Sequence, residues 1–183
     1  MRVIETEVPG LLIVEPRVHR DARGFFVETY HAPRYREHGI ADEFVQDNHS
    51  RSTRGALRGL HGQHPRAQAK LVRAILGEIF DVAVDVRPGS PTFGKWFGAT
   101  LSSGNHHQLW VPAGFIHGFC VLSETAEVEY KCTDFYDPGG ELGVLWNDPA
   151  IGIEWPLSEP ILSAKDAAAP LLAEVEEKLA GFR

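Results

Sequence analysis

The sequence predicts an all-β fold, a sandwich or barrel of short strands with a helical segment at its C-terminal end. Three observations support this prediction. Short apolar runs alternate with turn signals along a chain that contains 18 Gly and 12 Pro. Residues 78–86 alternate strictly between two faces, as a strand does. The tail over residues 166–180 is instead rich in Ala, Leu and Glu, which favours a helix that stops near Gly181.

The elements follow in order along the chain. A short apolar run ends at Pro16, and residues 33–38 suit a short helix with Pro33 in its first turn and Gly39 just past its end. Turns are expected over residues 21–24, 87–91, 112–114 and 137–140. Strands are expected over residues 11–16, 25–30, 78–86, 94–101, 108–111, 115–122 and 126–135.

Composition limits the class of protein. The length of 183 residues and 43% hydrophobic content suit a single domain over residues 1–183. A net charge of -7 argues against a nucleic-acid-binding protein. No apolar run approaches membrane-spanning length, and the first residues show no signal-peptide pattern. Cys120 and Cys132 lie in apolar strand-like segments, so we expect two buried free thiols and a cytoplasmic location.

Residues 56–73 contain several polar side chains of the kinds that bind anions or transfer protons. Arg58 can bind a phosphate, His61 titrates near neutral pH and Lys70 adds a second cation. A basic surface hairpin is the simpler interpretation of any one of them. Lys70, however, shares its strand face with Val72 and Ala74, and lysine is rarely buried without a partner or a function.

Alternation also orients His117 and Tyr130. His117 shares a face with Phe115 and Phe119, and Tyr130 shares a face with Val128, so both point inward. Buried His and Tyr are most often core residues with a satisfied polar tip. Together with Lys70, however, they supply a base, an acid and an electrostatic stabiliser to one barrel.

Arg58 and His61 conflict with strict alternation, which places them on opposite faces. They can converge only where the strand is bulged or bent, and Gly59 permits this.

A metal site is one alternative. Residues 112–117 resemble the second metal motif of the cupins, Pro-x-Gly-x-x-His. The first motif requires His-x-His followed by Glu, whereas this chain has His61-Gly-Gln-His64 followed by Lys70. An ammonium group is unfavourable beside a divalent cation, so we expect a cupin-like barrel without a metal.

At these residues the sequence closely resembles the dTDP-4-dehydrorhamnose 3,5-epimerases, a cupin family, over Pro9 to about Pro170. One matching block is Leu57-Arg-Gly-Leu-His61. The other blocks cover residues 21–26, 46–50, 68–72, 80–85, 108–119, 130–134, 146–149 and 163–166. The resemblance implies a cupin-type jelly-roll barrel with short peripheral helices. It also implies a homodimer that exchanges N-terminal strands, with neither metal nor other cofactor.

The resemblance also implies roles for individual residues. His61 corresponds to the catalytic base, Asp166 to its paired carboxylate, Tyr130 to the proton donor and Lys70 to the group that stabilises the enolate. The positions that bind the nucleotide sugar correspond to Arg23, Glu28, Gln46, Asn48, Arg58, His117, Glu141 and Lys165. Arg23 and Glu28 are expected to serve the neighbouring subunit. Gly62 departs from the family, which commonly has an aromatic residue there, and is expected to leave room beside His61.

The expected reaction inverts C3 and C5 of dTDP-4-dehydro-6-deoxy-D-glucose, the step toward dTDP-L-rhamnose. The motifs do not separate this reaction from inversion at C3 only or C5 only in another dTDP-deoxysugar pathway. A metal-dependent cupin enzyme and a barrel that only binds sugar nucleotides remain as alternatives from other classes.

Overall fold

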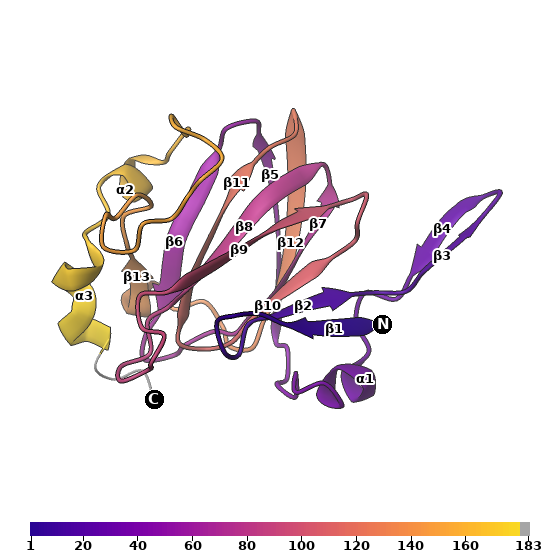
Figure 1. The fold of residues 1–183 in the computed structure, drawn as a ribbon, viewed down its shortest axis with the longest axis horizontal. Coiled ribbons are helices and arrows are strands. Elements are labelled where there is room, and N and C mark those ends of the chain that lie inside the picture. The colour runs from indigo at the N-terminus through magenta and orange to yellow at the C-terminus, as the bar shows by residue number, and fades with distance from the viewer. Residues whose placement is uncertain (180–183) are drawn as a thin grey trace.

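Two antiparallel sheets form the body of the protein in a computed structural model, which describes residues 1–179 (Figure 1). In spatial order, the first sheet contains β1 (Arg2–Glu5), β2 (Leu12–Glu15), β10 (Gln108–Val111), β7 (Lys70–Leu76), β12 (Thr125–Cys132) and β5 (Gln46–Thr53). The second contains β13 (Glu141–Gly143), β6 (Leu57–Gln63), β11 (Phe115–Val121), β8 (Glu78–Asp85) and β9 (Trp96–Ser102). Apart from β1–β2 and β8–β9, neighbours in each sheet are distant in sequence, as in a jelly roll, and the predicted all-β fold is confirmed.

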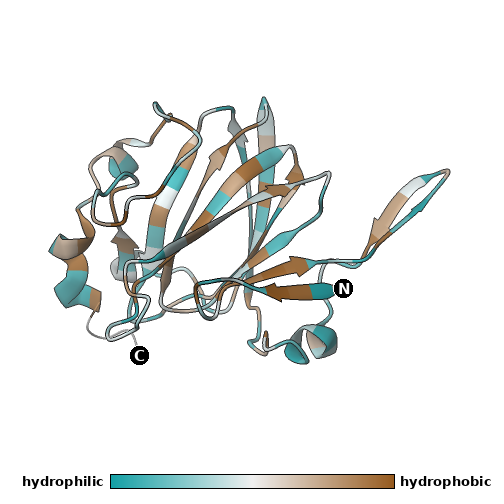
Figure 2. Cartoon of the chain, viewed as in Figure 1, coloured by the Kyte–Doolittle hydropathy of each residue, from teal (hydrophilic) through white to brown (hydrophobic). Residues whose placement is uncertain are grey.

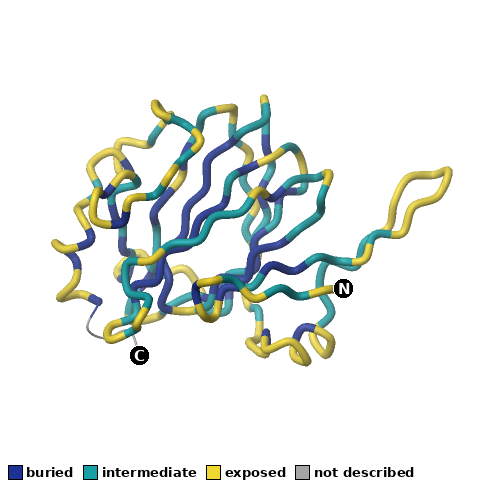
Figure 3. The backbone as a smooth tube through the Cα atoms, in the orientation of Figure 1, coloured by how far each residue is buried: buried dark blue, intermediate teal, exposed yellow. Residues whose placement is uncertain are grey.

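Three hydrophobic clusters hold these layers together (Figures 2 and 3). The largest lies between the sheets and includes Val72, Leu109 and Phe119. A second covers the outer face of the five-stranded sheet, where α3 (Leu172–Leu179) packs. The third lies beneath α1 (Ala32–Arg36) on the outer face of the six-stranded sheet. Each sheet therefore packs on the other through its inner face and is covered by a further cluster on part of its outer face.

The alternating side chains of β8 belong to two different hydrophobic clusters. Ile79 and Ala83 belong to the cluster between the sheets, whereas Val82 and Val84 belong to the outer cluster beneath α3. Asp81 lies on the inner face with Ile79 and Ala83 and is 0% exposed. A carboxylate at such a position needs a polar partner.

The prediction of a single helix over residues 166–180 is wrong, because the helix is interrupted in the middle of this segment. Two short helices occur, α2 (Ala164–Ala167) and α3. Pro170 lies between them; it has no N–H to donate, and its ring disfavours helical backbone at Ala169. Ala180 and the predicted stop at Gly181 lie outside the described residues.

The N-terminal part contains an arm of which the sequence predicted the turn and the second strand but not the first strand. Strands β3 (Val18–Asp21) and β4 (Gly24–Val27) pair only with each other and project away from the body (Figures 1 and 3). Phe25 and Phe26 on this arm are 55% and 69% exposed. The predicted strand over residues 25–30 therefore ends early, at Val27.

Two further observations bear on the predicted setting of the protein. Cys120 and Cys132 are both buried free thiols, as predicted. Among residues 1–179, no helix has the length and apolar character needed to cross a membrane.

Candidate functional site

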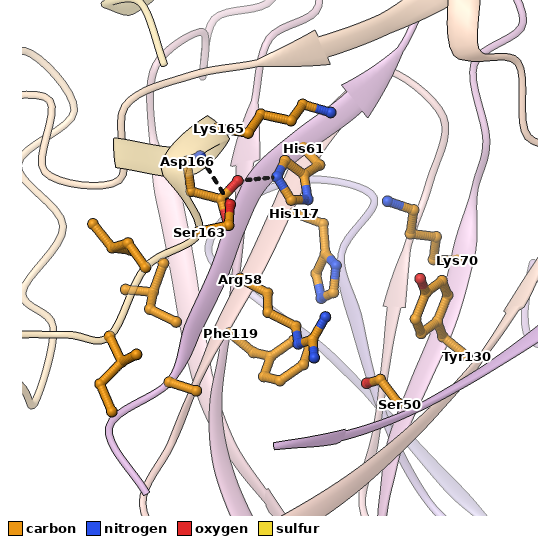
Figure 4. A pocket seen from close by; sticks show the side chains of 14 residues that line it. Ser50, Arg58, His61, Lys70, His117, Phe119, Tyr130, Ser163, Lys165 and Asp166 are labelled. Carbon is orange, nitrogen blue, oxygen red and sulfur yellow. Dashed lines mark hydrogen bonds and ion pairs between the residues drawn. The ribbon is translucent and has the colours of Figure 1, made fainter. Parts of the chain in front are cut away.

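The site is a cavity of about 410 Å³ that opens between the two sheets (Figure 4). Each element contributes one or two polar side chains. The lining includes Arg58 and His61 from β6, Lys70 from β7, His117 from β11, Tyr130 from β12, and Lys165 and Asp166 from α2. The inward orientation predicted for Lys70, His117 and Tyr130 is confirmed.

His61 and Asp166 form a close pair at one end of the cavity. His61 Nε2 lies 2.6 Å from Asp166 Oδ1, and the Asp166 side chain is only 6% exposed. Burial lowers the pKa of His61, while the hydrogen bond and charge of Asp166 act in the opposite direction. Ser163 accepts a hydrogen bond from the Asp166 backbone N–H and so begins α2. The pair combines a neutral base with a carboxylate that can stabilise its protonated form.

Lys70 lies across the cavity from this pair. Among the described residues, its ammonium group has no hydrogen-bond or ion-pair partner; Nζ lies 6.0 Å from the centre of the Tyr130 ring. Burial lowers the pKa of Lys70, and the negative potential of Cys132 and Asp81 opposes this change. An unpaired, partly buried ammonium group that lines a cavity is suited to stabilise an oxyanion.

Tyr130 comes from the sheet opposite to that of His61. Burial raises the pKa of the Tyr130 hydroxyl, and the charge of Arg58 opposes the change. The phenol is therefore protonated at neutral pH and available as an acid. Because β6 and β12 belong to different sheets, a ligand between them has the His61 base on one side and the Tyr130 hydroxyl on the other.

A bulge in β6 brings Arg58 and His61 to the same cavity. His61 pairs with His117 and Arg58 with Phe119, so three steps along β6 correspond to two steps along β11. Gly59 makes the bulge possible, with φ of 130°. The predicted irregularity at Gly59 is confirmed.

His117 has a buried partner that the sequence analysis missed. His117 Nε2 lies 2.8 Å from Asp81 Oδ1, and Asp81 is 0% exposed. The alternating pattern of β8 contained the signal, because it places Asp81 on the same face as Ile79 and Ala83. A carboxylate on an apolar strand face indicates a buried polar partner, here on the neighbouring strand β11.

A smaller cavity of about 230 Å³ shares the side chains of His61, Lys70 and Tyr130. Its further lining includes Gln46, Asn48, Tyr136 and Glu141. Gln46 accepts a hydrogen bond from the Tyr136 backbone N–H and donates one to Asn48. Glu141 accepts a hydrogen bond from the Tyr136 hydroxyl and forms an ion pair with Lys165. The ring of the half-exposed Tyr136 was not predicted as a site residue.

Arg23 and Glu28 are the predicted site residues that line neither cavity. Arg23 lies in the turn of the β3–β4 arm, where its 89% exposed side chain pairs with Asp21. Glu28 follows the arm and pairs with Arg34. The structure of one chain therefore does not bring these two residues to the other site residues.

Gly62 lines the smaller cavity beside His61, but its missing side chain is not what leaves room there. A Cβ atom at this position would lie 3.0 Å from Cγ2 of Ile116, which belongs to the outer hydrophobic cluster. The missing side chain would therefore point to the outer face of the sheet, away from the His61 ring.

The structure also bears on the alternative of a metal site. Within residues 1–179, no three His, Cys, Asp or Glu side chains gather into a group that could hold a metal ion. His117, from the second cupin motif, instead pairs with Asp81.

Comparisons with known proteins agree with this geometry. The family model described as dTDP-4-dehydrorhamnose 3,5-epimerase matches residues 5–174. A protein of that name from Neisseria gonorrhoeae is 55% identical over 184 residues; the match covers 100% of this chain and 56% of that longer protein.

Two solved structures are similar over nearly their whole length. An epimerase from Legionella pneumophila in complex with dTDP-4-keto-L-rhamnose is 52% identical, with a TM-score of 0.95 and coverage of 97% of this chain and 96% of that one. A 3'-monoepimerase from Streptomyces bikiniensis in complex with dTDP-quinovose is 36% identical, with a TM-score of 0.88 and coverage of 95% and 90%. The family model, the sequence identity and the shared fold agree: this chain belongs to the dTDP-4-dehydrorhamnose 3,5-epimerase family.

Proposed function

We propose that this chain is a 3,5-epimerase that converts dTDP-4-dehydro-6-deoxy-D-glucose into dTDP-4-dehydro-L-rhamnose. The observation that carries the proposal is the opposed pair of His61 and Tyr130, on different sheets, with the unpaired Lys70 ammonium group between the sheets. A sugar held between them meets a base on one face and an acid on the other.

The chemistry follows from the position of the ketone. C3 and C5 both flank the C4 carbonyl, so loss of a proton from either carbon gives an enolate. His61 removes the proton, and Asp166 stabilises the imidazolium ion that forms. Lys70 stabilises the negative charge on the C4 oxygen.

Tyr130 then protonates the same carbon from the opposite face, which inverts the centre. This leaves His61 protonated and Tyr130 ionised, so each cycle ends with a proton lost from His61 and one regained by Tyr130 through solvent. The same groups can then act on the second carbon.

The remaining side chains suit a nucleotide diphosphate. Arg58 points into the cavity and donates a hydrogen bond to Ser52 Oγ. Guanidinium groups bind phosphate oxygens through paired hydrogen bonds. Gln46, Asn48, Glu141 and Lys165 line the adjoining space, where the half-exposed Tyr136 ring offers a flat surface to a nucleobase.

We propose further that the protein is a homodimer in which the β3–β4 arm of one subunit completes the site of the other. The arm projects from its own body (Figure 3), which it touches where the Phe25 ring lies 4.7 Å from that of His106, and Phe25 and Phe26 are still 55% and 69% exposed. Arg23 and Glu28 would then reach the neighbouring cavity. The dimer, with one domain per chain, is expected to act in the cytoplasm, where its free thiols stay reduced.

Subunit mixing tests the exchange. Arg23→Ala and His61→Ala are each expected to lower activity when expressed alone. If arms exchange, each mixed dimer contains one site with both defects and one intact site, so co-expression restores activity. If the arm serves its own chain, every site keeps one defect and co-expression restores nothing.

The reaction itself is tested by NMR of dTDP-4-dehydro-6-deoxy-D-glucose in deuterated water. The proposal expects deuterium at both C3 and C5, with and without a chelator. Deuterium at one carbon would assign a C3-only or C5-only epimerase; the monoepimerase with the same fold keeps this as the second candidate. Loss of exchange with chelator would favour a metal-dependent enzyme. Ligand binding without any exchange would leave only a binding function.

A further inference from the structure

The segment that carries Asp166 is anchored on both sides of α2. Before the helix, the Ile161 carbonyl accepts a hydrogen bond from the Leu57 N–H at 3.0 Å, and Ile161 N–H donates to the Gly55 carbonyl at 2.8 Å. These bonds attach the segment to the start of β6. After the helix, the Pro170 carbonyl accepts a hydrogen bond from the Leu145 N–H at 2.8 Å. Asp166 thus lies between two attachment points.

Asp148 makes a third attachment, through its side chain. Asp148 Oδ2 accepts a hydrogen bond of 2.6 Å from the backbone N–H of Leu172, the first residue of α3. Asp148 Oδ1 accepts one of 2.8 Å from the Ala150 N–H. The residue is 2% exposed, and it forms no ion pair with any described residue. The first backbone N–H groups of a helix have no acceptor within the helix, and the Asp148 carboxylate accepts from one of them. Its negative charge also stabilises the positive N-terminal end of the helix dipole.

The chain that leads to Asp148 also holds His61. Gly143 of β13 pairs with His61 of β6, and Val144 exchanges two backbone hydrogen bonds with Leu60. Residues 141–148, here called the clamp segment, therefore contact His61 on one side and the segment that bears Asp166 on the other. Their backbone fixes His61, and their end, through Leu145 and Asp148, fixes the segment that bears Asp166.

We propose that Asp148 is a positioning residue for the reaction: by binding the start of α3, it holds Asp166 in hydrogen-bond distance of His61. Asp148 itself does not reach the substrate, because neither cavity has it in its lining. Its effect passes through Leu172 and the turn at Pro170 to α2. A displacement of about 1 Å would be sufficient, because it would take His61 Nε2 and Asp166 Oδ1 from 2.6 Å to beyond the normal hydrogen-bond range.

The first test uses catalysis and rests on the proposed epimerase function. Asp148→Ala is expected to lower kcat by about 10- to 100-fold with little change in KM, as misplacement of catalytic groups does. Asp148→Asn keeps one acceptor oxygen and is expected to lose less. In an Asp166→Ala background, Asp148→Ala should cause no further loss of kcat, because the two residues act in sequence. Additive losses would overturn the proposal.

The second test needs no substrate and separates this proposal from the proposed function. The pKa of His61 is measured by NMR of its imidazole signals in the wild type and in Asp148→Ala. Asp166 raises the pKa of His61 against the effects of burial, Lys70 and Lys165, so its displacement must lower that pKa. An unchanged His61 titration would overturn the positioning role even if the variant were inactive.

Asp85→Asn is the matched control for stability. Asp85 is also 0% exposed and also accepts a backbone N–H, that of Arg87, but it anchors the loop after β8 and has no link to α2. It should lower the melting temperature without moving the His61 pKa. If Asp148→Ala behaves in the same way, its role is structural only and the proposal fails.

Discussion

Replacement of Lys70 by Met is expected to make the protein more stable and nearly inactive. Lys70 begins β7 on the inner face, and its ammonium group has no hydrogen-bond partner among the described residues. Burial is the largest effect on its pKa, which is lowered. Met keeps the length of the side chain and removes the charge. The substitution therefore separates catalysis from stability, because activity should fall while stability rises.

The expected loss of activity follows from the role of the charge. Removal of one donor from an oxyanion site costs about 10²- to 10³-fold in kcat, or about 3–4 kcal/mol. Lys70 is the described cation that lines both cavities, so the upper part of this range is expected.

The stability change has the opposite direction. Because the pKa of Lys70 is lower in the folded state than in the unfolded chain, the unfolded chain binds more protons between the two values, and stability rises with pH there. Below the folded pKa the buried charge is fully destabilising. Lys70→Met should therefore melt at a higher temperature than the wild type at neutral pH, and this gain should shrink at alkaline pH.

The assay combines deuterium exchange at C3 and C5 with thermal melting across pH. Lys131→Met is the control, because Lys131 on β12 pairs with Asp47 on the outer face of the sheet. It should keep its activity and change stability by less than about 1 kcal/mol. Near-normal exchange in Lys70→Met would refute the catalytic argument, and a melting temperature below that of the control would refute the argument from burial.

Three further predictions concern the cavity wall. Asp166→Asn removes the negative charge that raises the pKa of His61, so the acid limb of the pH profile of kcat/KM should move to lower pH while its plateau falls. Gly59→Ala places a Cβ atom 2.5 Å from the β11 backbone at a positive φ, and a loss of at least about 1–3 kcal/mol is expected in denaturant unfolding, together with lost activity. Gly62→Ala crowds Ile116 on the outer face, so unfolding should show a loss of about 1 kcal/mol with substrate preference unchanged; altered preference would place the residue in the site after all.

Much of the site could be predicted because strand alternation fixes orientation. Lys70, His117 and Tyr130 each lie on a strand face shared with apolar neighbours, so their inward direction could be predicted before the fold was known. The bulge was predicted only as a possibility, because Gly59 allows positive φ without requiring it. Asp166 could not be found in this way: it pairs with His61 from 105 residues along the chain, and no periodic pattern connects the two.

The errors in the fold have equally local causes. Strand β13 has only three residues and exists because β6 offers it a partner, so its sequence carries little strand signal of its own. The apolar pattern of the tail continues past Pro170, which hid the break between α2 and α3. Arg23 is a different case: the resemblance assigns it to the neighbouring subunit's site, and that assignment stays a prediction, since within one chain its side chain pairs with Asp21.

The bulge in β6 has a consequence for redesign of the enzyme. Gly59 faces Gly118 on β11 so closely that a Cβ atom on either residue would lie within about 3 Å of the other strand's backbone. The obstacle is main chain, so no change in a neighbouring side chain can relieve it. The spacing of Arg58 and His61 is thus fixed by two backbones in contact. New sugar preferences should be sought by varying the cavity rim, at Tyr136, Ile161 and their neighbours, while this glycine pair is left intact.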